Sequence, residues 1–137
     1  AAGESGNKEF LKKLIYAQVR NVLLNKSFHE VMDVDTGRAW RWPHLPWHAA
    51  GFIGFIVNGI FGIRYSEQGI QIHPCILDEF EGAVLDSVPY QNAKFVFEIH
   101  GHGDSYTVKM DGNLVEGSFG KEMTGEHKVD IYAYETE

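Results

Sequence analysis

The segment covering residues 27–48 carries the densest collection of side chains that could do chemistry. Its candidate residues are one glutamate, one arginine, one histidine and all three tryptophans of the chain: Glu30, Arg41, His48, Trp40, Trp42 and Trp47. Aromatic faces pack against the C–H face of a pyranose, while charged side chains hydrogen-bond its hydroxyls. These residues therefore indicate a sugar-binding cleft. The alternative is that the tryptophans only plug the end of a helical bundle, because tryptophan is mostly buried in proteins.

Within this segment, Asp33, Asp35 and Gly37 are spaced superficially like a calcium loop. The EF-hand pattern needs a further ligand immediately before the glycine and a distal glutamate, and Thr36 occupies the first of those places. We therefore expect no metal here. The two aspartates are interpreted as turn residues whose side chains accept hydrogen bonds from local backbone N–H groups.

His100, His102 and Asp104 form a second candidate cluster, separated by glycines. Two histidines and an aspartate suit zinc, yet nothing else in the sequence supplies a fourth ligand at a recognisable spacing. Glycine and aspartate are typical of turns, so the sequence predicts a hairpin loop between two strands rather than a metal site.

Two helices must position the tryptophan segment. Apolar residues recur at three- and four-residue steps over residues 8–24, which predicts an amphipathic helix capped by Ser5 or Asn7. A second helix is expected to begin near Pro46 and to end at Gly62, with a loop between the two helices. This second helix is apolar on nearly every side, so it should lie inside a larger helical assembly.

Beyond Gly62 apolar residues alternate with polar ones, which is typical of strands. Asp111-Gly112 predicts a two-residue hairpin turn that joins two of them. Several short antiparallel strands with such turns indicate a β-sandwich or half of one. The sequence thus predicts an α+β chain, with a helical hairpin over residues 1–62 and an antiparallel β-sandwich-like domain over residues 63–137.

Composition excludes several functional classes. Lys+Arg 12 against Asp+Glu 19 gives a formal net charge of -7, so we expect no nucleic acid and no anionic membrane as partner. The longest apolar stretch, residues 49–57, is too short and too rich in glycine to span a bilayer. The single cysteine, Cys75, excludes an internal disulfide, and its apolar neighbours indicate a core residue rather than a nucleophile. No cofactor is indicated.

Two stretches of the helical half resemble the last helical hairpin of the six-hairpin, (α/α)6-barrel glycosidases, in their processing α-glucosidase and trehalase-like branch. They are Glu-Val-Met-Asp-Val-Asp-Thr-Gly at residues 30–37 and Trp-His-Ala-Ala-Gly-Phe at residues 47–52. Three positions depart from the pattern of that branch: Met32, Val34 and His48. Gly-Ile-Gln-Ile-His-Pro at residues 69–74 is similar to an element of the β-sandwich tail in the maltose-phosphorylase group.

By this resemblance, Glu30 falls where the α-glucosidase branch keeps the general base of an inverting hydrolysis. The general acid would come from an earlier hairpin, so we expect this chain, which starts at Ala1, to be a fragment that is inactive alone. The resemblance implies two partners, an oligosaccharide or glycoside and the missing upstream barrel segment. A phosphorylase is an alternative, although phosphate replaces the catalytic carboxylate in that branch.

Two other functions stay open at this point. A carbohydrate-binding module would grip sugar without cleaving it, because hydrolysis needs two carboxylates and only Glu30 is convincingly placed. A structural accessory domain would leave all activity to residues elsewhere, and Glu30 would then cap a backbone group or form an ion pair with Arg38 or Arg41. His48 would likewise be an ordinary histidine bonded to the backbone.

Overall fold

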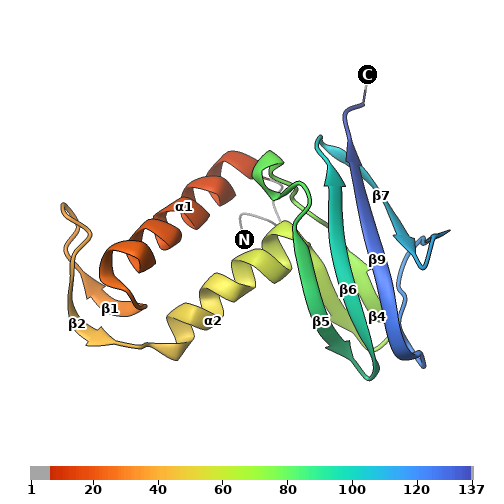
Figure 1. Cartoon of the computed structure of the whole chain (residues 1–137), viewed down its shortest axis with the longest axis horizontal. Helices are drawn as coiled ribbons and strands as arrows, with labels where there is room; N and C mark the ends of the chain where they lie inside the picture. Colours follow the sequence, from red (N-terminus) through yellow and green to blue (C-terminus); the bar gives the residue numbers. More distant parts are fainter. Residues whose placement is uncertain (1–6, 137) are drawn as a thin grey trace.

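The helices form an antiparallel pair that projects from a small β structure (Figure 1). The computed structural model describes residues 7–136, and its fold is α+β. Within those residues, two α-helices accompany a five-stranded sheet and two small two-stranded sheets. The change from helices to strands comes at Gly62–Ile63, where the sequence predicts it.

Helix α1 (Lys8–Asn25) confirms the helix that the three- and four-residue steps predict. Asn7 caps it, since its side-chain Oδ1 accepts a hydrogen bond from the Phe10 N–H at 3.0 Å. Ser5, the other predicted cap, lies outside the described residues. At the far end, Lys26 adopts the left-handed conformation that closes a helix, and its N–H donates to a carbonyl of the last turn.

Helix α2 (Pro46–Gly54) begins where the sequence predicts, with proline in its first turn. It continues as a π-helix, η1 (Phe55–Ile60), and the chain leaves it through Gly62, whose φ is +64°. A Cβ on Gly62 would lie 1.9 Å from the carbonyl oxygen of His73, so glycine is required for this close approach. Among the described helices, none is long and apolar enough to cross a membrane.

The prediction of a plain loop between the helices is wrong, because the segment contains a β-hairpin. Strand β1 (His29–Met32) pairs with β2 (Ala39–Pro43) in an antiparallel ladder whose register shifts after Val31. The strands are short and neither has a fully buried residue. With no buried face to impose alternation, their sequence carries no strand signal.

The main sheet has the strand order β5-β6-β9-β7-β8. The strands span Val84–Tyr90 (β5), Asn92–Gly101 (β6), Ser105–Met110 (β7), Asn113–Leu114 (β8) and Thr124–Tyr134 (β9). The predicted turn at Asp111-Gly112 is confirmed: it joins β7 to β8, and both of its residues have positive φ.

At the centre of this sheet the prediction of antiparallel strands is wrong, because β6 and β9 run parallel. Strand β7 pairs with β9 on the side away from β6, so residues 102–104 connect two strands that are not neighbours. The hairpin loop predicted around His102 is therefore wrong too. Alternation determines which side chains share a face of a strand, but it does not determine which strands become neighbours.

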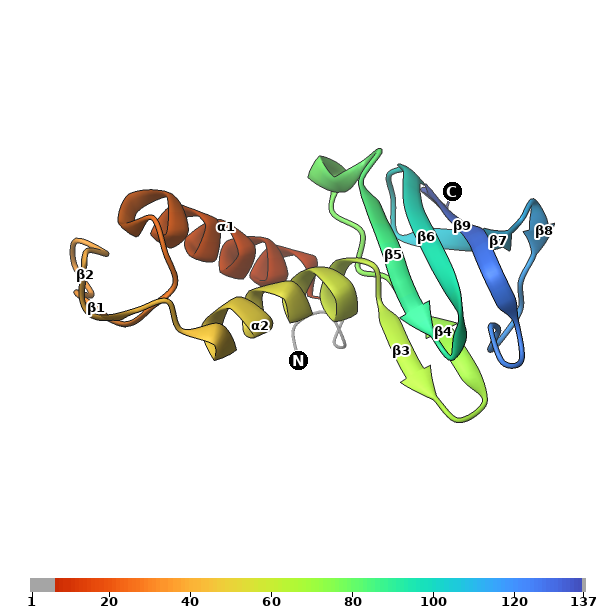
Figure 2. The same cartoon turned by 60° about the horizontal axis from the view of Figure 1, so that its bottom comes forward.

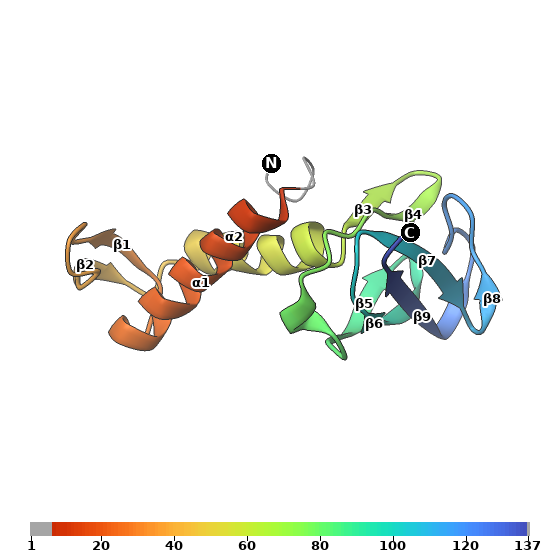
Figure 3. The same ribbon diagram turned by 90° about the horizontal axis from the view of Figure 1, so that it is seen from above.

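A second layer, the hairpin of β3 (Ile63–Ser66) and β4 (Gly69–Ile72), lies against one face of the main sheet (Figure 3). An isolated bridge between Ile70 and Phe119 links β4 to the connection between β8 and β9. A short 3-10 turn, η2 (Asp78–Phe80), lies on the connection from β4 to β5.

One hydrophobic core joins the two layers to the near ends of the helices (Figure 2). Its fully buried members include Leu11, Ile60, Phe61, Ile63, Ile70, Phe95, Phe97, Ile99, Val129 and Ile131. Cys75 is buried in the same core, which confirms its predicted place, and burial raises the pKa of its thiol. The helices therefore attach to the sheets at one end, and their other end extends away from the core.

Candidate functional site

The β1–β2 hairpin lies at the far end of the helix pair, away from the sheets (Figure 1). Glu30 belongs to β1, Trp40, Arg41 and Trp42 belong to β2, and Trp47 and His48 lie in the first turn of α2. All six predicted site residues are thus on three consecutive elements, β1, β2 and α2.

Asn25, the last residue of α1, fixes the hairpin to that helix. Its Nδ2 donates hydrogen bonds to the carbonyl oxygens of Asn21 at 3.0 Å and Gly37 at 2.9 Å. Its Oδ1 accepts a hydrogen bond from the Ala39 N–H at 2.8 Å. Because one amide group bonds to the helix, the turn and β2 together, the hairpin has a defined orientation relative to α1.

His48 fixes the hairpin to the second helix. The ring Nδ1 donates to the carbonyl oxygen of His29 at 2.7 Å. On the same side of the chain, Ser27 Oγ and His44 Nδ1 lie 2.9 Å apart in a further hydrogen bond. His48 therefore has the backbone partner that the structural alternative for it expects.

Asp33 accepts local hydrogen bonds in the hairpin turn, as the sequence predicts, whereas the carboxylate of Asp35 accepts none from the described residues. Asp33 Oδ1 accepts hydrogen bonds from the Asp35 N–H at 3.1 Å and from the Thr36 N–H and hydroxyl, both at 2.7 Å. The bonds from Thr36 lower the pKa of the Asp33 carboxyl. This carboxylate closes the turn between β1 and β2.

Glu30 is exposed like Asp33, but its carboxylate accepts none of the hydrogen bonds that Asp33 accepts. Within residues 7–136 its carboxylate has no hydrogen-bond or ion-pair partner. The ion pair with Arg38 or Arg41 that the structural alternative expects does not form. Arg41 instead lies over the ring of Trp40, with its guanidinium carbon 5.1 Å from the ring centroid.

The tryptophans are exposed rather than buried as a plug. The exposed fractions of Trp40, Trp42 and Trp47 are 65%, 59% and 60%. Trp40 and Trp42 both belong to β2, the strand that pairs with the strand of Glu30. Trp42 has a φ of +52°, so it departs from the extended conformation of a regular strand.

A small cleft of about 190 Å³ lies between α1, β1 and α2. Among the predicted site residues it is lined by Trp47 and His48, and the side chains of Gln18 and Asn21 face it from α1. Glu30 and the two tryptophans of β2 are outside this cleft. The structure therefore separates the predicted binding residues into a cleft and an exposed hairpin.

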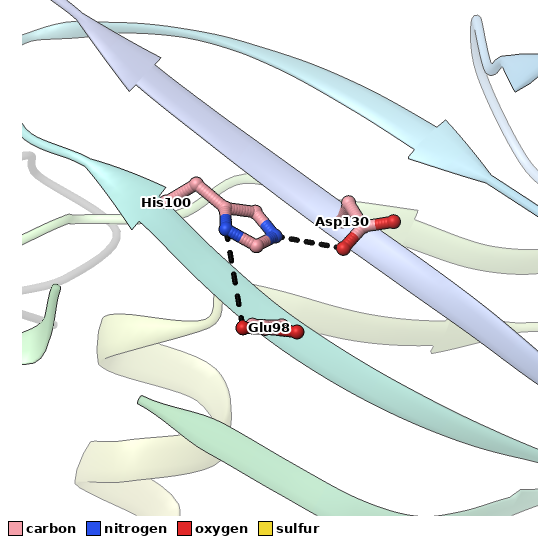
Figure 4. A group of neighbouring side chains, drawn as sticks. All are labelled: Glu98, His100 and Asp130. Carbon is pink, nitrogen blue, oxygen red and sulfur yellow. Dashed lines mark hydrogen bonds and ion pairs between the residues drawn. The ribbon is translucent and has the colours of Figure 1, made fainter. Parts of the chain in front are cut away.

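The second predicted cluster, around His100, is not assembled as the sequence suggested. Asp104 pairs with Lys8 Nζ at 2.6 Å, and His102 is exposed on the connection between strands. His100 instead lies with Glu98 of its own strand and Asp130 of β9 (Figure 4). Glu98 and His100 share a face by their two-residue spacing, but Asp130 reaches them only through the parallel pairing of β6 with β9.

Neither the comparison with protein-family models nor the comparison with curated proteins finds a match to this chain. The resemblance to six-hairpin glycosidases therefore stays a prediction.

Proposed function

We propose that this chain is the part of an inverting glycoside hydrolase that carries the catalytic base, Glu30, on a hairpin between two barrel helices. Its substrate would be an α-linked glucoside or a related oligosaccharide. The main observation in favour is a free, exposed carboxylate on a hairpin whose other strand carries two exposed tryptophans.

The state of the Glu30 carboxylate suits a general base. A base must accept a proton from a water molecule, and a carboxylate already bonded to arginine or backbone N–H groups does this less readily. Glu30 has no such partner among the described residues. The exposed rings of Trp40 and Trp42, on the strand that pairs with β1, suit the C–H face of a sugar ring.

The helix pair also suits membership of a larger helical assembly. Several large apolar side chains of α1 and α2 are exposed in the chain by itself: Phe10, Tyr16, Val19, Leu23, Leu24 and Ile53. Exposed apolar surface of this extent is typical of protein contact sites. In an α/α barrel these side chains would pack against neighbouring helices, and the β part would lie beside the barrel as a sandwich-like tail.

In the proposed reaction Glu30 removes a proton from water as that water attacks the anomeric carbon. The glycosidic bond breaks on the opposite face, where an acid from another part of the enzyme protonates the leaving oxygen. Inverting enzymes place the two carboxyl groups roughly 6.5–9.5 Å apart to leave room for the water. The hairpin position of Glu30 leaves space for such a partner.

The test is Glu30→Gln in the natural polypeptide that carries this sequence, assayed on α-glucosides. We expect kcat to fall by about 10²–10⁴-fold, the usual contribution of a general base, with KM little changed. Glu30→Ala should regain part of the lost rate with added azide, which replaces the activated water and yields a glycosyl azide of inverted configuration. Asp35→Asn is the matched control, because Asp35 is an exposed carboxylate in the turn of the same hairpin, and it should leave kcat unchanged. An unchanged kcat in Glu30→Gln would refute the assignment.

The stacking of Arg41 on Trp40 supports a second candidate, a carbohydrate-binding module without its own catalysis. An arginine held flat on an exposed ring combines an apolar surface with hydrogen-bond donors, which suits sugar recognition. In that case the chain alone would bind gluco-oligosaccharides, as measured by quenching of tryptophan fluorescence. Trp40→Ala would abolish the binding of the sugar, while Glu30→Gln would leave that binding intact. Glu30→Gln would also leave the turnover of α-glucosides by the natural polypeptide unchanged.

A further inference from the structure

Outside the hairpin, a group of ionisable side chains lies on the face of the main sheet that points away from the core. Glu98 and His100 are on β6, and Asp130 is on β9 (Figure 4). Glu98 and Asp130 are direct partners in the parallel ladder, so their side chains leave the sheet next to each other. Along the two strands they alternate with the buried core residues Phe97, Ile99, Val129 and Ile131, so all three side chains lie on the opposite face.

The distances bring one ligand atom of each residue into a single region. His100 Nε2 is 2.7 Å from Asp130 Oδ1, and His100 Nδ1 is 3.9 Å from Glu98 Oε1. One imidazole nitrogen and one oxygen of each carboxylate all lie within 4.8 Å of one another. The ring of Tyr132 stacks on His100 with the centroids 4.7 Å apart, which holds the orientation of the imidazole.

A cation is already held between the two carboxylates, namely the ammonium group of Lys128. Its Nζ lies 2.8 Å from Glu98 Oε2 and 3.0 Å from Asp130 Oδ1. The side chain of Lys128 is 52% exposed, whereas that of Asp130 is 12% exposed. The lysine can therefore turn into solvent, while the carboxylate that it neutralises stays where the sheet holds it.

A further charged group on this face, Lys109, does not compensate the carboxylates. Lys109 is opposite Asp130 in the β7–β9 ladder, but its Nζ lies over the ring of Tyr132, 5.3 Å from the centroid. One ammonium thus faces two carboxylates, which leaves a net negative charge when the imidazole is neutral.

From this arrangement we propose that Glu98, His100 and Asp130 form a binding site for a divalent transition-metal ion of the zinc class, with Lys128 displaced when the ion binds. One imidazole and two carboxylates are ligands that zinc accepts, whereas calcium prefers six or more oxygens. Bonds of about 2.0–2.2 Å to a tetrahedral ion place its ligand atoms roughly 3.4 Å apart. His100 Nε2 and Asp130 Oδ1, which are 2.7 Å apart, would therefore separate slightly to admit the ion, by small rotations about their χ angles.

Three protein ligands leave one position of a tetrahedral ion for water or an external ligand. The ion would also tie β6 to β9, the parallel pair at the centre of the sheet. An ion that binds the folded state but not the unfolded state stabilises the fold, so zinc should raise the melting temperature of the chain. This proposal does not depend on the glycosidase proposal, since the cluster is on the sheet and its test uses no sugar and no turnover.

The experiment is titration of the chain with Zn²⁺ by calorimetry, and with Co²⁺ by its visible absorption. We expect one ion per chain, and at least a ten-fold weaker affinity in His100→Ala. His102→Ala is the matched control, because His102 lies two residues away and is exposed, and it should bind as the unchanged chain does. Lys128→Gln should bind several-fold more tightly, because no ammonium then competes for the carboxylates.

A readout that needs no variant is the NMR signal of the His100 imidazole, which should shift on addition of Zn²⁺ before the other histidines do. The proposal is overturned if Zn²⁺ binds no more tightly than about 1 mM, or if His100→Ala binds equally well. In that event the four side chains are an ion-pair network and nothing more. Weaker binding in Lys128→Gln would overturn the displacement of the lysine.

Discussion

At the scale of single residues, Asp111 fixes the β7–β8 turn onto β9. Its Oδ1 accepts a hydrogen bond from the Lys128 N–H at 2.9 Å, and its Oδ2 lies 2.7 Å from His127 Nδ1. His127 also stacks on Phe95 of the core, with the ring centroids 5.6 Å apart. The hydrogen bond to Asp111 raises the pKa of His127, and the hydrogen bond from His127 lowers the pKa of Asp111.

This pair predicts a pH dependence of stability. Because the pKa of His127 is raised in the folded state, its contribution to the free energy of unfolding is complete below the ordinary histidine value of 6.5. That contribution is lost as the pH rises through the folded-state pKa. The lowered pKa of Asp111 means that its contribution is present above the ordinary value of 3.8 and is lost as the pH falls through the folded-state pKa. The pair should therefore stabilise the fold most between these two ordinary values.

The measurement is the melting temperature of the chain at pH 6 and at pH 8.5, compared with that of His127→Gln. The unchanged chain should lose on the order of a few degrees more than the variant over this interval. Equal losses in the two proteins would show that the pair contributes nothing. His102→Gln, at an exposed histidine, is the control and should follow the unchanged chain.

At the scale of elements, Gly62 determines how the second helix meets the β part. Two properties require glycine there: a φ of +64°, and the carbonyl oxygen of His73 only 1.9 Å from a built Cβ. Gly112 has a φ of +83°, but nothing lies within 4 Å of its built Cβ. A substitution at Gly112 would therefore add only backbone strain, whereas one at Gly62 would add both backbone strain and a steric clash.

We predict that Gly112→Ala costs about 1–2 kcal/mol, the usual penalty of a left-handed conformation for a residue with a Cβ. Gly62→Ala should cost more than about 4 kcal/mol or prevent folding, because the backbone at His73, just after β4, must also move. Urea unfolding of both variants measures the difference. Similar costs for the two would mean that the close approach at His73 does not restrict the fold.

The elements that could be predicted from sequence are those with local signals. A capping asparagine and apolar residues spaced three or four apart predict α1. Pro46 and Gly62 predict where the second helix begins and ends, and Asp111-Gly112 predicts a turn. The β1–β2 hairpin gives no such signal, because its short strands have no fully buried residue. Its existence depends on Asn25 and other side chains that bond to it from the flanking helices.

At the scale of the whole molecule, the helices depend on the β part for their burial. Leu11 of α1 is 1% exposed and lies in the common core, with one of its methyl groups 3.2 Å from a Cβ built on Gly59. Leu23, three turns further along the same helix, is 64% exposed. The near end of α1 is therefore part of the core, and the far end is open to a partner.

We predict that Leu11→Ala lowers the free energy of unfolding of the chain by about 2–5 kcal/mol, as is usual for a leucine removed from a core. Leu23→Ala should change it by no more than about 0.5 kcal/mol. Helical and sheet signals in circular dichroism should be lost together in both proteins, since one core joins the two parts. A large effect of Leu23→Ala would mean that this leucine is covered, for instance by a second copy of the chain.

The sequence by itself determined the features that depend on neighbouring residues. These are the Asn7 cap of α1, the position at which helices give way to strands, and the tight turn at Asp111-Gly112. Each follows from hydrogen bonds or steric limits within a few residues, so the order of side chains is sufficient to predict it.

The tertiary structure decided which distant residues meet. The parallel pairing of β6 with β9 places Asp130 beside Glu98 and His100, whereas sequence spacing groups His100 only with His102 and Asp104, in a predicted hairpin loop. Strand pairing depends on the burial of whole faces, and periodicity shows which side chains share a face but not which strand lies next to it. The free state of Glu30 is likewise a tertiary property, because only the folded hairpin places Arg41 on a tryptophan ring instead of on the carboxylate.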